Sequence, residues 1–285
     1  MRKVQPSCDD MFFLSRGSGD PILFLHGIPT SCQLWSGVIE RMTDCFTCLA
    51  VDLPGLGRTA RRTRGFGEFS ELVDAIETVR IRNNVDKWHI VSHDAGCAIA
   101  VHYAHRHPEH VSRLALLTPS IFPELEPFFL FEMLRKPFLG EMIAPAVNVI
   151  FWKLVMRRVF AGNRALHAAI EDFHAPFAGP LGAWRLMSLL RWGCPTEVLA
   201  SIPALLPQLL MPTLIMHGSK DPAVPECFAT RASQLIPNSE KVILDSGHFL
   251  PMNEPALIAS SLLSFLDSGN ASIPDSWTPS AVASS

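Results

Sequence analysis

The stretch Ile90-Val91-Ser92-His93-Asp94-Ala95-Gly96-Cys97 determines how the rest of the chain is interpreted. An apolar run at residues 88–91 leads into it, and a helix-compatible run at residues 98–104 follows it. The small residues on both sides of Asp94 permit a sharp turn of the backbone between the two runs. We therefore expect a strand that turns directly into a helix and presents Asp94 at the end of a sheet.

A strand, a sharp turn and a helix in this order form the nucleophile elbow, usually written G-x-S-x-G. The residue at the tip of this elbow is Asp94 instead of serine. A carboxylate attacks saturated carbon and forms an ester, whereas a serine alkoxide attacks acyl carbon. An aspartate at a strand-to-helix junction is also a common N-cap that accepts hydrogen bonds from free amides. The other motifs of the chain must distinguish these two roles.

The composition predicts a globular chain that does not bind nucleic acid. With 285 residues, 48% hydrophobic and 18% charged, we expect one large domain or one domain with an inserted subdomain. The formal net charge of -3 argues against nucleic acid, which usually requires a basic face. The first ten residues have no apolar segment after their basic residues, so no secretory signal is predicted. No uninterrupted apolar run reaches the ~18 residues of a membrane span.

The cysteine pattern favours a cytoplasmic location. Seven scattered cysteines are typical of reduced thiols rather than of a disulfide framework. Cys45 and Cys48 form a lone C-x-x-C, but their apolar surroundings read as a strand and no second ligand pair follows at zinc-site spacing. We predict neither a metal nor an organic cofactor.

Seven short apolar runs predict strands, at residues 11–14, 22–25, 45–51, 88–91, 114–117, 213–216 and 241–244. Helical stretches alternate with them, at residues 33–42, 70–83, 98–107, 227–235 and 256–266. This alternation predicts an α/β fold, a mostly parallel sheet with helices on both faces. In such sheets the ligand site lies beyond the carboxyl ends of the strands.

The region from 121 to 207 breaks the alternation and is rich in Phe, Leu, Met, Trp and Pro. We interpret it as a helical lid inserted between two halves of the core, residues 1–120 and 208–267; additional core is the alternative. Within it, the run from Phe128 to Phe131 is a candidate membrane-surface patch or a homodimer contact. The Ser-, Pro- and Ala-rich tail, residues 268–285, is predicted to be disordered.

The motifs along the chain resemble those of the α/β-hydrolase superfamily, in the family's order, over residues 10–267. They are His26-Gly27-Ile28-Pro29, Asp52-Leu53-Pro54-Gly55-Leu56-Gly57, the elbow at Asp94, Asp221 and Gly247-His248-Phe249. The chain order nucleophile, acid, histidine also matches. An elbow aspartate preceded by histidine resembles the branch of epoxide hydrolases and of haloalkane or haloacid dehalogenases.

The resemblance implies a role for each residue of a catalytic triad. Asp94 would attack a carbon that bears a strained or good leaving group and form an ester with the substrate. His248 would activate the water that cleaves this ester, and Asp221 would orient the imidazole. The backbone amides of Ile28 and Ala95 would form the oxyanion hole.

Other polar residues near these motifs have simpler expected roles. Asp245 is a rival acid three residues before His248, but its place at a strand end favours a turn. Asp52 matches a motif that is structural in this superfamily. We expect hydrogen-bonding or packing roles for His26 and His93. Because both flank the site, they are also candidates for substrate binding, and Pro29 and Phe249 are two further candidates.

The chain departs from the family where the leaving group is stabilised. Epoxide hydrolases commonly supply lid tyrosines, but the one tyrosine, Tyr103, follows the elbow. His167 and His174 are the available donors in the predicted lid. Haloalkane dehalogenases usually place tryptophan directly after the nucleophile and a polar donor in the first motif, where this chain has Ala95 and Ile28. The alternative halide donors are lid indoles, at Trp152, Trp184 and Trp192.

The first hypothesis is therefore an epoxide hydrolase that acts on a small apolar organic substrate and water. A haloalkane dehalogenase with an unusual halide site is the second hypothesis. A ligand-binding protein that retained the fold without catalysis is the third, and unusual chemistry on a natural-product ester, lactone or ring is the fourth. The complete triad argues against the ligand-binding protein.

Overall fold

The computed structural model describes residues 11–59, 69–126, 129–156, 164–179, 181–192 and 196–267. The predicted disordered tail lies outside these residues, as does Phe128 of the predicted apolar patch. The side chains of residues 164–168 and 192 are also outside the described part, although the backbone of both segments is helical.

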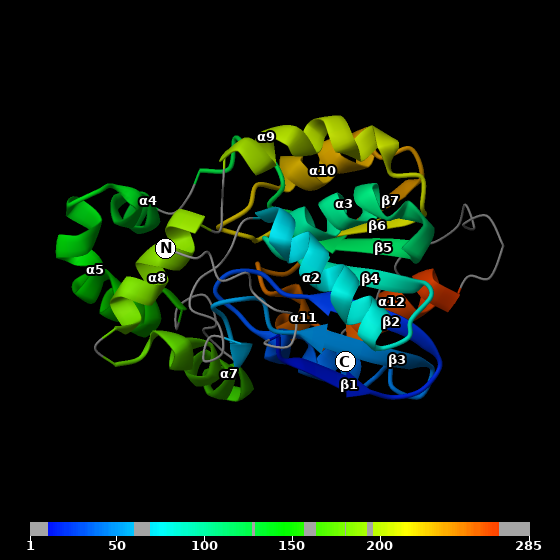
Figure 1. Cartoon of the computed structure of the whole chain (residues 1–285), viewed down its shortest axis with the longest axis horizontal. Helices are drawn as coiled ribbons and strands as arrows, with labels where there is room; N and C mark the ends of the chain where they lie inside the picture. Colours follow the sequence, from blue (N-terminus) through cyan, green and yellow to red (C-terminus); the bar gives the residue numbers. More distant parts are fainter. Residues whose placement is uncertain are drawn as a thin grey trace.

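A seven-stranded sheet forms the centre of the protein, and each predicted apolar run overlaps one of its strands (Figure 1). The strands are β1 (Phe13–Arg16), β2 (Asp20–Leu25), β3 (Phe46–Val51), β4 (Trp88–His93), β5 (Val111–Leu117), β6 (Thr213–Gly218) and β7 (Ser239–Leu244). Their order is β1-β3-β2-β4-β5-β6-β7, with β1 antiparallel to β3 and all other neighbours parallel. The α/β prediction with a mostly parallel sheet is confirmed.

Helices cover both faces of this sheet, which explains the continuous burial of its central strands. On one face lie α2 (Phe69–Arg82) and α3 (Gly96–Arg106), drawn in front of the strands in Figure 1. Three further helices, α1 (Ser36–Ile39), α11 (Leu250–Asn253) and α12 (Pro255–Asp267), pack against one another. The helix α10 (Glu226–Leu235) packs on β6 and β7. Two short 3₁₀ turns, η2 (Cys32–Trp35) and η4 (Pro108–His110), complete the core.

The described chain between β5 and β6 is helical. It contains α4 (Phe129–Arg135), α5 (Leu139–Ile150), the π-helical turn η5 (Phe151–Met156), α7 (Arg164–His174), η6 (Ala175–Phe177), α8 (Gly182–Trp192), α9 (Thr196–Leu205) and η7 (Leu206–Gln208). In Figure 1, α4, α5, α7 and α8 lie beyond one end of the sheet, and together with η5 they are called the cap helices below. The predicted lid also includes α9, but α9 packs against α3 of the core.

One helical stretch of the described chain, Leu139–Met156, has the length and mean hydropathy, 1.4 over 18 residues, of a possible membrane span. It consists of α5 and η5, and Glu141, Asn148 and Lys153 interrupt its apolar sequence. A third of the stretch is buried, because one face of α5 packs against α4 and α8. The stretch is long and apolar enough to cross a membrane by length and composition only.

The turn between β4 and α3 forces Asp94 into the left-handed region, with φ of +50°. Two glycines make this turn possible, because backbone beside Gly96 and the Asp94 side chain beside Gly27 leave no room for a Cβ. A Cβ on Gly96 would lie 2.6 Å from the carbonyl oxygen of His26 and 2.8 Å from that of Leu25. A Cβ on Gly27 would lie 2.4 Å from Asp94 Oδ2. The end of β2 and the start of α3 therefore touch directly.

Replacing Gly96 with alanine is expected to lower the free energy of unfolding by roughly 2 kcal/mol or more, because rigid backbone must move. Urea denaturation measures this change. Gly247→Ala is the matched control, since a Cβ there would meet only Asn253 Nδ2 at an ordinary 3.5 Å. Equal destabilisation by both substitutions would contradict the close approach at Gly96.

Candidate active site

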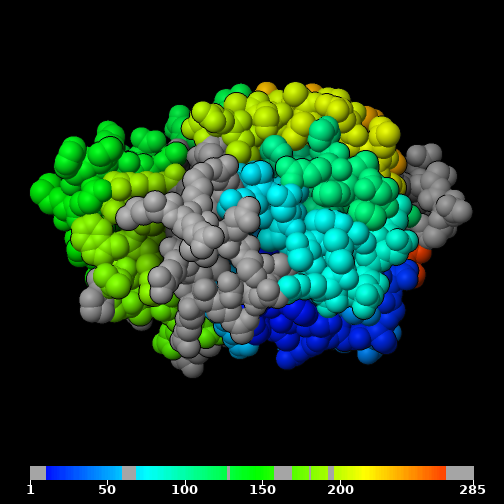
Figure 2. All heavy atoms as spheres, in the orientation of Figure 1, coloured from blue at the N-terminus to red at the C-terminus, as the bar shows by residue number. Residues whose placement is uncertain are grey.

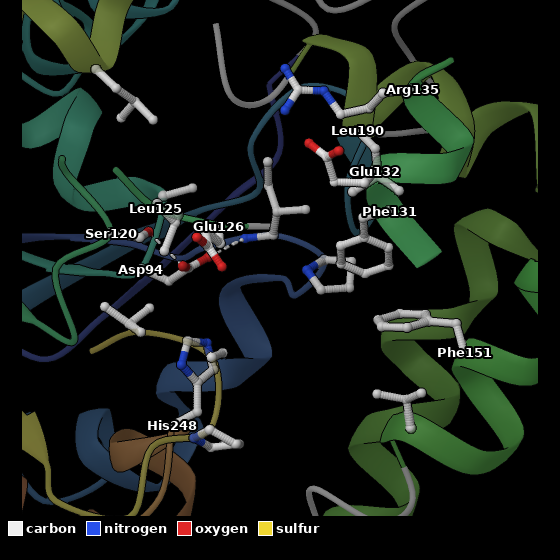
Figure 3. A pocket seen from close by; sticks show the side chains of 18 of the residues that line it. Asp94, Ser120, Leu125, Glu126, Phe131, Glu132, Arg135, Phe151, Leu190 and His248 are labelled. Carbon is white, nitrogen blue, oxygen red and sulfur yellow. Dashed lines mark hydrogen bonds between the residues drawn. The ribbon is translucent and has the colours of Figure 1, made fainter. Parts of the chain in front are cut away.

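The carboxylate of Asp94 accepts hydrogen bonds on both of its oxygens. The backbone amide of Ile28 donates to Oδ2 at 3.1 Å, and the hydroxyl of Ser120 donates to Oδ1 at 2.6 Å. Figure 3 shows both contacts as dashed lines at one end of a cavity. The carboxylate also lies at the N-terminus of α3, where the helix dipole favours negative charge. Each oxygen of Asp94 therefore has a distinct, fixed environment.

His248 and Asp221 form a buried pair beside Asp94. His248 Nδ1 donates to Asp221 Oδ2 at 2.9 Å, and their side chains are 8% and 1% exposed. The other oxygen of Asp221 accepts from the backbone amides of Ala223 at 2.7 Å and Val224 at 3.0 Å. With Nδ1 engaged, the ring of His248 presents Nε2 to the cavity, and in Figure 3 it points toward Asp94.

Charge and burial act in opposite directions on His248. Burial disfavours the imidazolium, but the hydrogen bond and negative charge of Asp221, together with the charge of Asp94, outweigh it, so that the pKa of His248 is raised above 6.5. Burial also disfavours the Asp221 carboxylate, yet His248 and the two backbone amides lower the pKa of Asp221 below its usual value. The pair therefore stabilises a proton on the histidine.

Two buried histidines hold the loops around the site. His93 Nε2 donates to the carbonyl of His248 at 2.9 Å, and burial lowers the pKa of His93 to about 4, so its ring is neutral at pH 7. His26 Nδ1 donates to the carbonyl of Gly27 at 2.8 Å, while its Nε2 accepts from the amide of Leu53 at 2.9 Å. Both side chains are completely buried. Their contacts are those of positioning residues.

A cavity of about 490 Å³ opens in front of Asp94 and His248. Its near wall contains Ile28, Pro29, Ala95 and Phe249, and Figure 3 shows Phe131, Phe151 and Leu190 of the cap helices on the opposite side. Most of the residues that line it are apolar. The polar lining residues are Asp94, Ser120, Glu126, Glu132, Arg135, Thr196 and His248. The cavity suits an apolar molecule whose reactive carbon approaches Asp94.

Several predicted substrate-binding residues lie elsewhere. His26 and His93 do not line this cavity, because their rings hold the loops behind it. Trp152 is also absent from the lining, since its buried indole stacks on Phe177 and lies against His174.

The other cap candidates contribute no described donor to the cavity. His174 is outside the lining and Trp184 is partly exposed outside it as well. The side chains of His167 and Trp192 lie outside the described part of the chain. Tyr103 donates to Glu77 Oε2 at 2.7 Å on the far side of α3. Among the described side chains, therefore, none of the hydrogen-bond donors suggested by the resemblance lines this cavity.

Sequence reasoning missed Ser120, which contacts the carboxylate most closely. Its signal is its position: it comes shortly after β5, and Asp94 comes directly after β4, the parallel neighbour of β5, so both residues lie at the same sheet edge. The expectations for two acids agree with their contacts. Asp245 forms an exposed ion pair with Lys220 at 2.7 Å, and Asp52 accepts from the backbone amides of Cys32 and Arg58. Within the described residues no cluster of three acidic, Cys or His side chains has the geometry of a metal site.

Comparison with known proteins places these features in one family. The model of the family described as alpha/beta hydrolase fold matches residues 20–255. A soluble epoxide hydrolase of a Corynebacterium species is 35% identical over 38% of this chain and 37% of its own length. A haloalkane dehalogenase of Mesorhizobium japonicum is 31% identical over 57% of this chain and 54% of its own. The chain thus spans about a third to a half of these two relatives.

Solved structures agree in fold. The crystal structure of haloalkane dehalogenase DbeA from Bradyrhizobium elkani has a TM-score of 0.76 and 23% identity, and it covers 90% of this chain and 94% of its own. Cfl2 from Burkholderia cenocepacia gives a TM-score of 0.76 and 23% identity, with 90% of this chain and 91% of its own covered. At this identity the similarity shows the arrangement of sheet and helices.

Histidine titration followed by NMR tests the electrostatics of the site. We expect the pKa of His248 above 6.5 in the unmodified protein and below 6.5 in Asp221→Asn, because burial then dominates. His89, whose pKa burial lowers to about 4, is the internal control and should titrate near pH 4 in both proteins, because neither Asp221 nor His248 acts on it. A pKa of His248 that stays unchanged in Asp221→Asn would contradict the pairing.

Proposed function

The chain belongs to the α/β-hydrolase fold family, and from that premise we propose that it is a hydrolase that forms a covalent ester on Asp94. One observation carries the proposal: the two oxygens of Asp94 are held differently. Oδ2 accepts from the Ile28 amide and Oδ1 from the Ser120 hydroxyl, while Asp94 and His248 line the same cavity. These different contacts suit a nucleophile in which one oxygen bonds to the substrate and the other carries the negative charge of the later intermediate.

In the first step, Asp94 Oδ1 attacks an electrophilic carbon of the substrate. The new carbon–oxygen bond forms as the bond to the leaving oxygen breaks, and the released alkoxide takes up a proton from solvent water. The mostly apolar lining of the cavity solvates the carboxylate less well than bulk water, which strengthens it as a nucleophile. The product of this step is a hydroxyalkyl ester of Asp94.

In the second step, His248 Nε2 removes a proton from water as its oxygen attacks Cγ of Asp94. Asp221 stabilises the imidazolium that forms, as the raised pKa of His248 indicates. The tetrahedral oxyanion develops on Oδ2, at the amide of Ile28 and near that of Ala95. Collapse breaks the Cγ–Oδ1 bond, and Oδ1 leaves with the product after it takes the proton from His248. One water oxygen remains in the Asp94 carboxyl group, which then releases the second water proton to solvent and returns to the carboxylate, balancing the proton taken up in the first step.

Epoxides are the favoured substrates because the described cavity offers no indole to hold a halide. Trp152 and Trp184 lie outside the lining, and the positions of the usual halide donors carry Ile28 and Ala95. Ring strain activates an epoxide carbon for attack by the carboxylate, and the developing alkoxide needs a hydrogen-bond donor. A donor that can stabilise its alkoxide is the guanidinium of Arg135, which lines the cavity.

Haloalkane dehalogenation is the second candidate, and the relative from Mesorhizobium japonicum supports it. A binding protein without catalysis would gain nothing from the buried Asp221–His248 pair beside Asp94. We further propose that the cap helices act as a lid, because Phe131 and Phe151 close the cavity from the side opposite the sheet.

The covalent step can be tested by trapping the ester in His248→Ala. Without a base to activate water, the ester should persist and add mass to the intact protein. A panel of epoxides and haloalkanes distinguishes the two candidates. An epoxide adds its whole mass, and a haloalkane adds its mass less one hydrogen halide.

The control for this experiment is the double variant His248→Ala with Asp94→Asn, which should gain no mass. Peptide mapping of the single variant should place the adduct on Asp94. An adduct that persists in the double variant would contradict the assignment of the nucleophile. Absence of any adduct across the panel would contradict both substrate classes.

Ser120 has a specific place in this scheme. Its hydroxyl donates to Oδ1, the oxygen that bonds to substrate and later departs with the product. The hydrogen bond stabilises the free carboxylate, which opposes the first step. It also stabilises the negative charge that develops on Oδ1 as the ester breaks, which favours the second step.

Ser120→Ala is therefore expected to slow cleavage of the ester about tenfold while formation of the ester is unchanged or faster. Pre-steady-state measurements would show a larger burst of ester and a lower steady-state rate. Thr196→Val is the matched control, because it removes a hydroxyl from the same cavity without touching Asp94. A slower burst in Ser120→Ala would contradict this role.

A further inference from the structure

The outward face of α5 and η5 carries an apolar stripe. Its large members are Phe138, Met142, Val149, Ile150 and Leu154, which are between 39% and 89% exposed. With the exposed Ala146, Met142, Ile150 and Leu154 recur every four residues along one side of the helix. The exposed Pro145 and Val149 lie beside this row, and Phe138 is the residue before the helix begins. These five large residues and the two small ones are called the outer stripe. A water-facing helix normally has the opposite pattern.

The inner face of the same helix is firmly packed. Ala144, Val147 and Phe151 are buried, and Asn148 Nδ2 donates to the carbonyl of Phe177 at 3.0 Å. This anchoring fixes α5 against α4 and α8 at the outer end of the molecule (Figure 2). The helix cannot cross a membrane without losing these contacts, whereas the outer stripe is already available for one.

The charges around the outer stripe are basic. Lys136 precedes the stripe and Lys153 lies near its other end, and both are exposed. Glu141 is the acidic residue of this helix, and Arg191 pairs with it at 2.7 Å. Lysines at the borders of an apolar helical face are typical of helices that lie at a lipid surface.

The same charges disfavour a second copy as the partner. An antiparallel two-fold packing of two outer stripes would place Lys136 beside the partner's Lys153. A parallel packing would place Lys136 beside the partner's Lys136. The outer stripe has no free carboxylate to offset either contact, and juxtaposed like charges disfavour association.

We propose that the outer stripe binds the boundary between the headgroups and acyl chains of a lipid surface, with α5 lying parallel to it. Over the 18 residues of Leu139–Met156 the helix is about 27 Å long, enough for an extended contact. Phe131, Phe151 and Val155 line the catalytic cavity from the same cap helices. The lipid-facing surface and the cavity wall are therefore opposite sides of one thin layer. Lipid binding itself does not depend on the chemistry at Asp94.

Flotation of the full chain with lipid vesicles tests the proposal. The probes are vesicles of phosphatidylcholine alone and vesicles with about one third phosphatidylglycerol. We expect the protein to float with both. The variant Val149→Glu with Leu154→Glu should reduce the bound fraction at least about tenfold, because two apolar contacts become charged. Leu210→Glu is the matched control, since Leu210 is 76% exposed on the core, and its binding should be unchanged.

The basic border is tested by Lys136→Ser and Lys153→Ser. Each should weaken binding to the anionic vesicles about fivefold at low salt, with little effect on phosphatidylcholine alone. Circular dichroism of every variant should match the unmodified protein, because all five substituted positions are exposed. These measurements require no turnover, so they are independent of whether an ester forms on Asp94.

Three results would overturn the proposal. In the first, the unmodified protein floats with neither type of vesicle. In the second, light scattering shows a dimer that Val149→Glu with Leu154→Glu converts to a monomer, which would assign the outer stripe to a second copy. Equal loss of flotation in Leu210→Glu would also contradict a binding site on α5.

Discussion

The left-handed backbone at Asp94 is the constraint on which the site depends. An aspartate at φ of +50° is unfavourable on its own, and the contacts on both sides of the turn maintain it. The amide of Asp94 donates to the carbonyl of Leu117, and its carbonyl accepts from the amide of Cys97. Gly27 and Gly96 let β2 and α3 approach the turn from the other side. The consequence is a carboxylate that projects from the sheet edge into a cavity, with one oxygen already at a backbone amide.

The second half of the site depends on a buried charge pair. Two backbone amides stabilise the negative charge of the buried Asp221 carboxylate. The carboxylate can therefore orient the His248 ring and stabilise a proton on it, although both side chains are almost inaccessible to solvent. His93 fixes the backbone of His248, and it can do so because burial keeps its own ring neutral. A second positive ring at this place would repel an imidazolium. Neighbouring histidines thus have different roles because their hydrogen-bond partners differ.

The core was predictable from sequence because its signals are local, and the cap was not. Short apolar runs that end in polar motifs identify parallel strands, and all seven runs overlap strands of the sheet. The elbow was recognisable because small residues must flank its tip. In the cap, aromatic residues serve both the cavity and the packing between helices, and sequence does not separate the two. Trp152 therefore read as a ligand contact, whereas its indole packs on Phe177. Ser120 was missed because its role depends on strand order, which brings the end of β5 beside Asp94.

The central claim is that Asp94 itself becomes part of an ester and gives one of its oxygens to the product. A single turnover in water enriched in oxygen-18, with enzyme in excess over any substrate that it converts, tests this claim most directly. The account predicts that the first product contains no label and that the label appears in the peptide that carries Asp94. Label in the first product and none in that peptide would mean that water attacks the substrate directly, with Asp94 as a base instead of a nucleophile.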